Sequence, residues 1–487
     1  MFNTVKYLVN NLRTSAKDDS NLGKRRESED KHNYLVDRIS LLPYEVLVSI
    51  ASLLSLKEAA ATSVLSRRWK NVWKYTTTLN FQDLDLFVGD NFYCLKLLEE
   101  NLRDEKSRKY VDWVDRVLVQ HEGHTIERFK AFFFLNNIFK NSIDKWIEFA
   151  MQKRVQVLEL QFFIKQYDFT IDNYEFPQNL IGLGGEGEYS NHIPTQHLCR
   201  YNNVGFKFLK VLRLQQICLT DEVLEYFLSN CPVLERLTVT VARGLVCVRV
   251  VGPSISLKYL AILDCPNLKS IEICNPNIAS FVYMGACIDL LINNVPLLIE
   301  VHISERALHY VDFTTVAFNR LSFCLSHLEI LKLNISGVVY NPNYDFPVLE
   351  NLKQLELNVE TNYQWALYHL YSFMKACPHI HRLILKLEFQ TYVETIVSKA
   401  PKFSHHSLKV VEIMGYRGYQ CAVEHVVYLI ENVVALEKII IDPVRRWIWP
   451  PGMDRGTEMV KEEVKGRKHA KEHLKERVPS TLEFECL

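Results

Sequence analysis

From residue 155 onward the sequence repeats one short pattern: an apolar position, two variable positions, an apolar position, one variable position and a last apolar position. Apolar side chains two positions apart fall on the same face of a β-strand, so each copy predicts one short strand. From Leu328 to the end the copies are almost evenly spaced, but the step from Leu257 to Leu268 is much shorter. The copies begin at Val155, Leu209, Leu234, Leu257, Leu268, Leu298, Leu328, Leu352, Ile380, Leu408 and Leu436.

Prolines support the positions of these strands, because a proline stands two residues ahead of the copies at Leu234, Leu268, Leu298 and Ile380. Proline cannot donate a ladder hydrogen bond, so it suits the entry to a strand and ends a preceding helix. Amphipathic stretches between copies, such as residues 221–228, predict short helices. One strand per period of roughly 20–29 residues is typical of leucine-rich repeats. We therefore predict an α/β solenoid over residues 77–400, with a curved parallel sheet on the concave side, helices or coil outside, and an insertion at about 176–205.

Residues 37–74 show helical periodicity instead. Pro43 suits the first helical position, and the residues from Ser55 to Glu58 form a capping-box pattern that opens a second helix. Ser66 can cap a third, basic helix. The apolar positions of the first helix are Val46, Leu47, Ile50, Leu53 and Leu54. Three helices in under forty residues can hardly bury this apolar surface among themselves, so we expect a partner to cover the rest.

These residues resemble the F-box. The family's opening Leu-Pro is matched by Leu42-Pro43, and its plant-type ending by the segment from Ser63 to Trp69. Tyr44 departs from the family, which usually has Asp or Ser there. The resemblance implies an F-box over residues 34–76 that binds the Skp-type adaptor and, through it, the cullin of a ubiquitin ligase. The adaptor contacts that it implies are Leu42, Pro43, Leu47, Ile50, Leu53 and Trp69.

The end of the chain resembles a second module. Residues 408–442, with the turn from Gly415 to Gly418, are similar to the FBD module found at the end of plant F-box/leucine-rich-repeat proteins. We expect an FBD-like terminal repeat at residues 401–445 and a charged C-terminal cap or tail at 446–487. Terminal caps are expected in any solenoid. Residues 1–33 are expected to be a flexible leader, although their basic, amphipathic start leaves a transit peptide as an alternative.

Composition narrows the possible partners. Lys+Arg and Asp+Glu both number 57, so the formal net charge is zero and no global field attracts nucleic acid or an anionic membrane. No apolar run reaches transmembrane length. The 12 cysteines include no C-x-x-C pair, which is typical of reduced thiols in a nuclear or cytoplasmic protein. We expect a protein partner, no nucleic acid and no membrane.

Catalytic and cofactor motifs are weak. The segment from Gly182 to Gly187 satisfies G-x-G-x-x-G but lacks the preceding strand and following helix that a dinucleotide site needs. His121 and His124 lack metalloprotease spacing, and the Cys377–His381 segment has no second ligand pair nearby. We predict no enzyme activity, no catalytic residues, no metal site and no cofactor.

The candidate binding surface is the concave face. In each copy the residue between the last two apolar positions should point there, and this face is mixed in sign, which suits a protein partner. The residues expected to contact a substrate are Arg213, Glu272, His302, Lys332 and Glu356. We predict a non-catalytic substrate receptor of an SCF-type (Skp–cullin–F-box) ubiquitin ligase. The alternatives are an adaptor-bound scaffold without degradation, and a receptor that senses a small ligand on the concave face.

Overall fold

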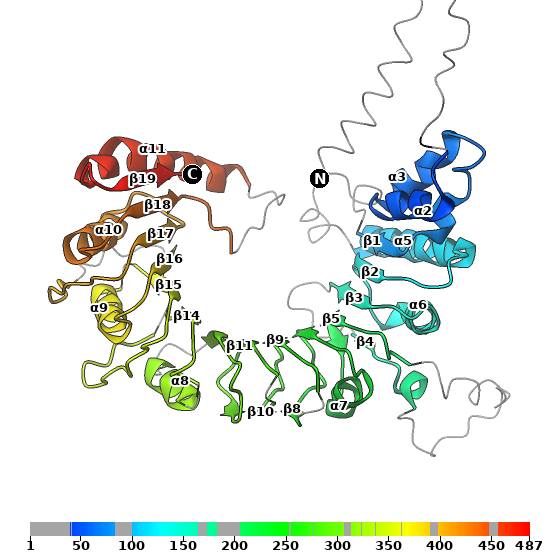
Figure 1. The fold of residues 1–487 in the computed structure, drawn as a ribbon, viewed down its shortest axis with the longest axis horizontal. Helices are drawn as coiled ribbons and strands as arrows, with labels where there is room; N and C mark the ends of the chain where they lie inside the picture. Colours follow the sequence, from blue (N-terminus) through cyan, green and yellow to red (C-terminus); the bar gives the residue numbers. More distant parts are fainter. Residues whose placement is uncertain are drawn as a thin grey trace, which may run out of the picture. The chain divides into compact units, whose positions relative to one another are not determined.

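The chain divides into two compact units, residues 1–47 and 48–487, which are considered separately. The computed structural model, drawn in Figure 1, describes residues 39, 41–82, 100–163, 173–182, 205–252, 255–275, 277–305, 313–322, 324–336, 338–361, 363–389, 398–447 and 456–487. The leader predicted at 1–33 and most of the insertion predicted at about 176–205 lie outside these ranges.

The first two predicted helices are confirmed. Helix α2 (Tyr44–Ser52) begins directly after Pro43, whose carbonyl oxygen accepts hydrogen bonds from the N–H groups of Val46 and Leu47 at 3.0 and 3.2 Å. Helix α3 (Leu56–Ala61) begins at the predicted capping box: the Glu58 N–H donates to Ser55 Oγ at 3.2 Å, and the Ser55 N–H donates to Glu58 Oε2 at 3.1 Å. These bonds satisfy N–H groups that a helix start leaves without partners.

The third predicted helix is wrong in form. Across residues 62–75, all of which the structure describes, the chain follows the short 3-10 helices η1 (Thr62–Val64) and η2 (Val72–Tyr75) joined by turns. The N–H of Trp69 donates to the carbonyl of Ser66, and that of Val72 to the carbonyl of Trp69. Both bonds join residues three apart, as in a 3-10 helix, and not four apart as in an α-helix. Trp69 and Val72 are buried in this segment. The sequence pattern around Ser66 did not indicate their burial.

The predicted solenoid sheet is confirmed as 14 strands paired in parallel (Figure 1). Each strand presents alternate residues to the core, as the repeated pattern requires. In spatial order the strands are β1 (Thr78–Phe81), β2 (Arg128–Phe133), β3 (Val157–Phe162), β5 (Val211–Gln215), β7 (Arg236–Thr240), β9 (Tyr259–Leu263), β11 (Ser280–Gly285), β13 (Glu300–Glu305), β14 (Ile330–Asn334), β15 (Gln354–Glu360), β16 (Arg382–Glu388), β17 (Val410–Met414), β18 (Lys438–Asp442) and β19 (Glu483–Cys486).

Helices cover the convex face of this sheet, so the fold is an F-box followed by a leucine-rich-repeat solenoid (Figure 1). Their apolar faces turn toward the sheet, as in other amphipathic helices. They are α5 (Glu100–Gln120), α6 (Lys140–Gln152), α7 (Asp221–Asn230), α8 (Phe313–Leu321), α9 (Ala366–Ala376), α10 (Gln420–Asn432) and α11 (Thr457–His469). Short elements complete the layer: η4 (Asn137–Phe139), η5 (Gln178–Ile181), the paired strands β4 (Tyr174–Glu175) and β6 (Ile217–Cys218), η7 (Ala470–Leu474) and η8 (Lys475–Arg477).

A second sheet explains the irregular place in the repeat. Strands β8 (Cys247–Val251), β10 (Ser270–Cys274) and β12 (Asp289–Ile292) pair in parallel and form an outer layer. The copy that begins at Leu268 builds β10 of this outer sheet, so its assignment to the concave sheet was wrong. The main-sheet strand of that repeat is β11, which follows a degenerate copy at Ile278.

Repeat length accounts for the outer strands. The strand register places Arg236, Tyr259, Ser280 and Glu300 in one row, and these positions follow one another closely in the sequence, so the repeats are short. Further along, Gln354, Arg382, Val410 and Lys438 share a row at wider and even intervals, which leaves room for α9 and α10. We call residues 236–305 the short-repeat region and residues 354–442 the long-repeat region.

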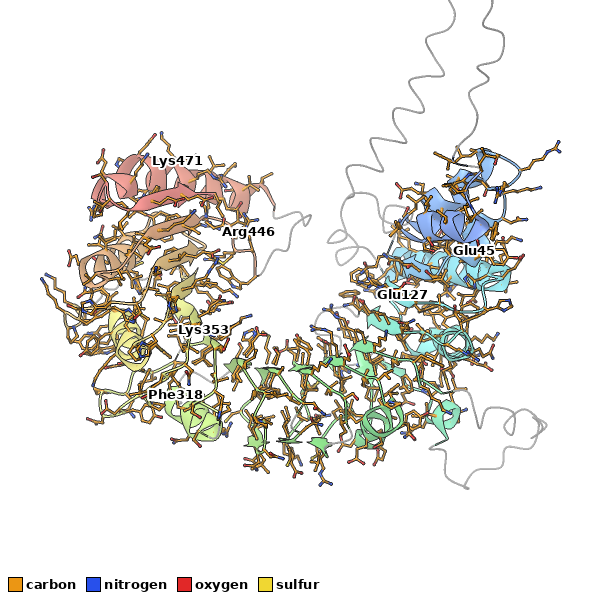
Figure 2. The ribbon with its side chains drawn as sticks, in the orientation of Figure 1. Glu45, Glu127, Phe318, Lys353, Arg446 and Lys471 are labelled. Atoms are coloured by element: carbon orange, nitrogen blue, oxygen red, sulfur yellow. The ribbon has the colours of Figure 1, made fainter. Side chains whose placement is uncertain are left out.

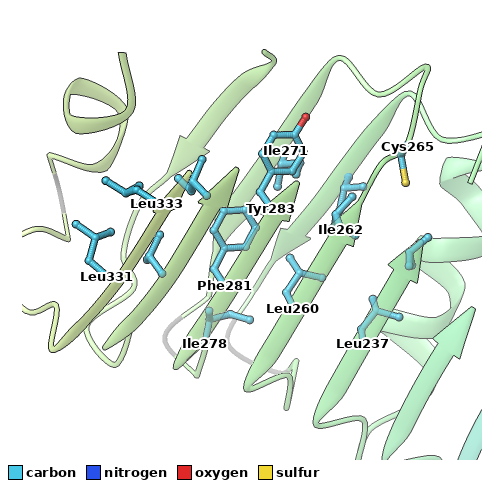
Figure 3. Packing of buried hydrophobic residues seen from close by; sticks show 14 of the residues in the cluster. Leu237, Leu260, Ile262, Cys265, Ile271, Ile278, Phe281, Tyr283, Leu331 and Leu333 are labelled. Carbon is cyan, nitrogen blue, oxygen red and sulfur yellow. The ribbon is translucent and has the colours of Figure 1, made fainter. Parts of the chain in front are cut away.

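The core lies between the main sheet and the outer layer. Leu260, Ile262, Phe281 and Tyr283 of adjacent strands point into it and are almost fully buried (Figure 3). Farther along the chain lies Phe318 of α8, which is labelled in Figure 2. The centroid of its ring is 5.1 Å from that of Phe346 and 6.0 Å from that of Phe373. Stacked repeats therefore share one continuous apolar layer.

The turn from Gly415 to Gly418 seats helix α11. Gly415 and Gly418 have φ angles of 76° and 79°, a left-handed conformation that favours glycine. A side chain at Gly466 of α11 would lie 2.5 Å from the carbonyl oxygen of Tyr416, and the Tyr416 hydroxyl lies 2.9 Å from His469 Nδ1. This close fit brings α11 against the last long repeat and lets β19 extend the sheet.

Candidate protein-binding surfaces

Two of the predicted adaptor contacts are buried. Leu47 is 0% exposed and Trp69 is 2% exposed, so neither side chain is presented to a partner in this structure. An apolar position at helical spacing can equally serve the interior, so the adaptor contact predicted for these two residues stays a prediction. Pro43 and Leu53 are exposed and Leu42 and Ile50 are half-buried. Whether these four residues contact the adaptor stays a prediction.

The second unit carries exposed apolar side chains within the F-box segment. Leu53 is 73% exposed, Val64 88% and Leu65 60%. Large exposed apolar side chains that are close in the chain are a sign of a protein interface. Sequence reasoning missed Val64 and Leu65 as surface residues, although they stand between two serines in the segment Ser63–Ser66.

The concave face presents one continuous row of side chains across the main sheet. Arg213, His302, Lys332 and Glu356 lie in this row, so the predicted alignment of these four is confirmed. In spatial order the row is Asn80, Lys130, Glu159, Arg213, Thr238, Ala261, Val282, His302, Lys332, Glu356, Ile384, Glu412, Ile440 and Glu485.

Glu272 does not belong to this face, which corrects its prediction as a substrate contact there. It lies on β10 of the outer sheet, and its Oε2 accepts from Arg249 Nε at 2.9 Å. Val282 of β11 occupies the corresponding place in the concave row. The sequence pattern alone could not separate the two, because inner and outer strands of the short repeats alternate with the same period.

Ion pairs neutralise much of the charge on the concave face, whose side chains are drawn in Figure 2. Lys130 and Glu159 lie 2.9 Å apart, and Lys332 and Glu300 lie 2.7 Å apart. Arg382 and Glu412 lie 2.5 Å apart, and Lys386 pairs with Glu356. Sequence reasoning missed Glu300 and Lys386, because these partners sit two positions along neighbouring strands and only the register brings them together.

His302 lies among these charges. Burial and the nearby lysines Lys386 and Lys332 together lower the pKa of His302 to about 4, against the opposing effect of Glu356 and Glu300. The imidazole is therefore neutral near pH 7. A neutral, half-buried ring at the middle of the row gives a partner a hydrogen-bonding group without a net charge.

The described cysteines are free thiols. Burial raises the pKa of Cys231 to about 12 and that of Cys265 to about 11, so both stay protonated and packed. Cys377 is buried while His379 and His381 are exposed, and no group of three His, Cys, Asp or Glu residues suited to a metal occurs in the described ranges.

Two further sequence features have a structural outcome. Gly182 ends η5 with a φ of 79°, and the rest of the glycine-rich segment lies outside the described residues. Among the helices that the structure describes, none is long and apolar enough to cross a membrane.

Comparisons with known proteins agree with both parts of the fold. A family model described as At1g61320/AtMIF1, LRR domain, matches residues 117–487, and the F-box domain model matches residues 39–77. The chain is 27% identical over 440 residues to the Arabidopsis thaliana F-box/FBD/LRR-repeat protein At5g22700, covering 83% of this chain and 92% of that protein. It is 25% identical over 450 residues to F-box/FBD/LRR-repeat protein At5g22660 of the same plant, covering 86% and 91%. F-box/LRR-repeat protein At3g58930 is 24% identical over 454 residues, covering 84% and 90%.

Proposed function

Because the chain belongs to the family of plant F-box/leucine-rich-repeat proteins, we propose that it is the substrate-receptor subunit of an SCF-type ubiquitin ligase. In this proposal the F-box binds a Skp-type adaptor and, through it, a cullin, while the repeats bind the protein to be ubiquitinated. The receptor performs no bond chemistry. Its contribution is proximity, because it holds a substrate lysine near the charged conjugating enzyme. We expect it to act in the nucleus or cytoplasm.

The observation that carries the proposal is the exposed apolar surface inside the segment matched by the F-box model. Leu53, Val64 and Leu65 expose apolar surface to water, which is unfavourable in free energy. A partner that covers these side chains removes that unfavourable exposure. Pro43, Leu42 and Ile50 remain proposed contacts of the same adaptor.

The concave row supports the second half of the proposal. His302, Lys332 and Glu356 present charges and hydrogen-bonding groups from the neighbouring strands β13, β14 and β15, and Arg213 does so from β5 farther along the same sheet. A client that replaces the existing ion pairs with its own charges must match both sign and spacing, so this surface favours specificity over raw affinity. A protein segment several residues long fits such a row better than a small ligand, which needs an enclosed pocket.

A single-residue variant tests the adaptor contact. Leu53→Asp places a charge on an exposed side chain, so the repeats should stay folded while adaptor co-purification falls at least about tenfold. The matched control is Val119→Asp, because Val119 is also highly exposed but lies at the end of α5, outside the F-box segment. Undiminished adaptor binding by Leu53→Asp would remove the main support for the docking proposal.

Affinity purification with and without proteasome inhibition tests the ligase role. Clients of a ligase should accumulate in ubiquitinated form when the proteasome is blocked. The Leu53→Asp purification should still recover them, because the repeats stay folded, but without ubiquitin. Clients that bind equally with and without inhibition, and carry no ubiquitin, would favour an adaptor-bound scaffold instead. A client that binds only after addition of a small molecule would favour the ligand-sensing alternative.

A further inference from the structure

One open groove lies where the F-box segment meets the first repeat helix. It has a volume of about 500 Å³. Helix α3 supplies one wall, η2 supplies Trp73, and helix α5 supplies the other wall; all of these elements belong to the second unit. The lining residues are Leu56, Lys57, Ala60, Trp73, Lys109, Trp113, Arg116 and Val117.

The floor of the groove is apolar and firmly built. Leu56 is buried, and Trp113 packs edge-on against Phe81 with ring centroids 5.2 Å apart. The Phe81 carbonyl in turn accepts a hydrogen bond from the Tyr110 hydroxyl at 2.9 Å. Trp113 is therefore packed against the core of the first repeats, so this part of the groove is preorganised before a partner binds.

The rim of the groove is cationic. The charged residues that line it are Lys57, Lys109 and Arg116, and none of the lining residues is acidic. Lys109 pairs with Glu105 at 2.5 Å, outside the groove, while Arg116 Nε donates only to the backbone oxygen of Asp112 at 3.0 Å. Within the described ranges, neither Lys57 nor Arg116 has an ion-pair partner. On a chain of zero net charge, this local excess selects an occupant of opposite sign.

We propose that this groove receives an acidic segment of the Skp-type adaptor, anchored by an apolar or aromatic side chain between Trp73 and Trp113. The proposal rests on the proposed function and deepens it, because it extends the adaptor's footprint from the F-box helices to the first repeat helix. Charge complementarity defines the occupant's chemistry. The chain order favours the adaptor over a client, since Leu53 stands just before α3 and Val64 just after it.

Such a contact fixes how the repeats are held relative to the ligase. Helix α3 already packs with β1 and η2 in one compact unit, residues 48–487. A second adaptor contact on α5 therefore ties the adaptor to the same unit that carries the repeats, and a defined geometry raises the effective concentration of substrate lysines near the conjugating enzyme.

The test is the affinity of a purified plant Skp-type adaptor for the full-length chain. Lys57→Glu combined with Arg116→Glu should weaken binding about tenfold and should flatten its dependence on salt between roughly 50 and 300 mM. The matched control is Arg108→Glu combined with Lys145→Glu, which makes the same charge change at exposed residues of α5 and α6 outside the groove. This control should leave adaptor affinity within about twofold of the wild type.

A second variant tests the proposed apolar contact between Trp73 and Trp113. Ala60→Trp fills the groove without removing any contact and should also weaken adaptor binding severalfold, with an unchanged melting temperature. If the wild type binds the adaptor and both groove variants bind equally well, the groove inference is wrong while the proposed function stands. Loss of clients without loss of adaptor would likewise overturn it, because the groove would then serve substrates. If the wild type binds no adaptor at all, the proposed function fails and the inference fails with it.

Discussion

The short-repeat region and the long-repeat region carry the same inner sheet under different outer layers. The shorter repeats are covered by β8, β10 and β12, whereas the longer repeats are covered by α9 and α10. A strand advances about 3.3 Å per residue and a helix about 1.5 Å, so a strand crosses the outer face with fewer residues. Outer strands also match the inner strand spacing of about 4.8 Å, while packed helices stand about 8–10 Å apart and make neighbouring repeats fan out.

This difference decides where a charged side chain ends up. In the long-repeat region each repeat has one strand, so the residue between the last two apolar positions points to the concave face, as Glu356 does. In the short-repeat region each repeat has two strands with the same alternation, so Glu272 points outward from the second sheet. Repeat length therefore controls the binding surface as well as the cover of the core.

The largest effect should come from cavities in the two cores. Leu260→Ala in the short-repeat region and Leu383→Ala in the long-repeat region each remove a fully buried side chain, and each should lower the free energy of unfolding by about 2–5 kcal/mol. Because repeats contact mainly their neighbours, hydrogen exchange should speed up most in the mutated region. Urea unfolding and hydrogen exchange measure both. Equal acceleration across both regions would contradict the view that the two outer layers protect separate parts of the core.

Acid should destabilise the long-repeat region through a buried histidine. Burial lowers the pKa of His425 on α10 to about 4, whereas an unfolded histidine titrates near its ordinary value of 6.5. The unfolded chain therefore takes up the proton first, and stability that is present above pH 6.5 is lost as the pH falls toward 4. His425→Leu should reduce this loss, measured as the shift in urea midpoint between neutral pH and about pH 4.5.

His302→Leu in the short-repeat region is the matched variant, because its pKa is also lowered to about 4 although its ring is only half-buried. It should reduce the acid sensitivity about as much as His425→Leu does, because the two pKa values are lowered to the same value. A much smaller effect of His302→Leu would show that the concave face accommodates a charged ring better than the core beneath α10 does.

The next largest effect should be the loss of stability when glycines at the ends of two strands are replaced by alanine. Gly415→Ala in the long-repeat region meets a φ of 76° and a Leu387 carbonyl oxygen 3.0 Å from the new methyl group, so it should cost about 1–3 kcal/mol. Gly285→Ala in the short-repeat region meets the Tyr283 hydroxyl at 2.9 Å, but Gly285 does not have the left-handed φ of Gly415, so this substitution should cost less. Thermal melting of both variants measures the difference. A Gly285→Ala protein as unstable as Gly415→Ala would show that the short repeats are packed more rigidly than the long ones.

The smallest change in stability should come from reversing charges on the two faces. Glu272→Lys breaks an exposed pair with Arg249 and should cost less than about 1 kcal/mol, with no effect on client capture. Glu356→Lys breaks a more buried pair with Lys386 on the concave face, and should reduce recovery of ubiquitinated clients severalfold while adaptor binding persists. Quantitative proteomics of both purifications gives the comparison. Client loss with Glu272→Lys alone would move the binding surface to the outer sheet.

Sequence patterns were sufficient for much of the fold. Alternating apolar residues marked most inner strands, the capping box at Ser55 marked α3, and the F-box resemblance located the segment proposed to dock the adaptor. These features depend on neighbours within a few residues, so they are visible without a structure. The predicted third helix is replaced by η1, η2 and turns, and Trp69 within this segment is buried, which its sequence spacing did not indicate.

The candidate sites show the same division more sharply. The sequence by itself determined that Arg213, His302, Lys332 and Glu356 share one face, because a fixed alternation within each strand sets it. Only the tertiary structure decided that Glu272 lies on another sheet, that Lys386 and Glu300 neutralise the row, and that Trp73 and Trp113 form one groove. The physical reason is that register between strands and packing between helices join residues tens of positions apart. A local pattern carries no information about which of its equivalent copies becomes the neighbour.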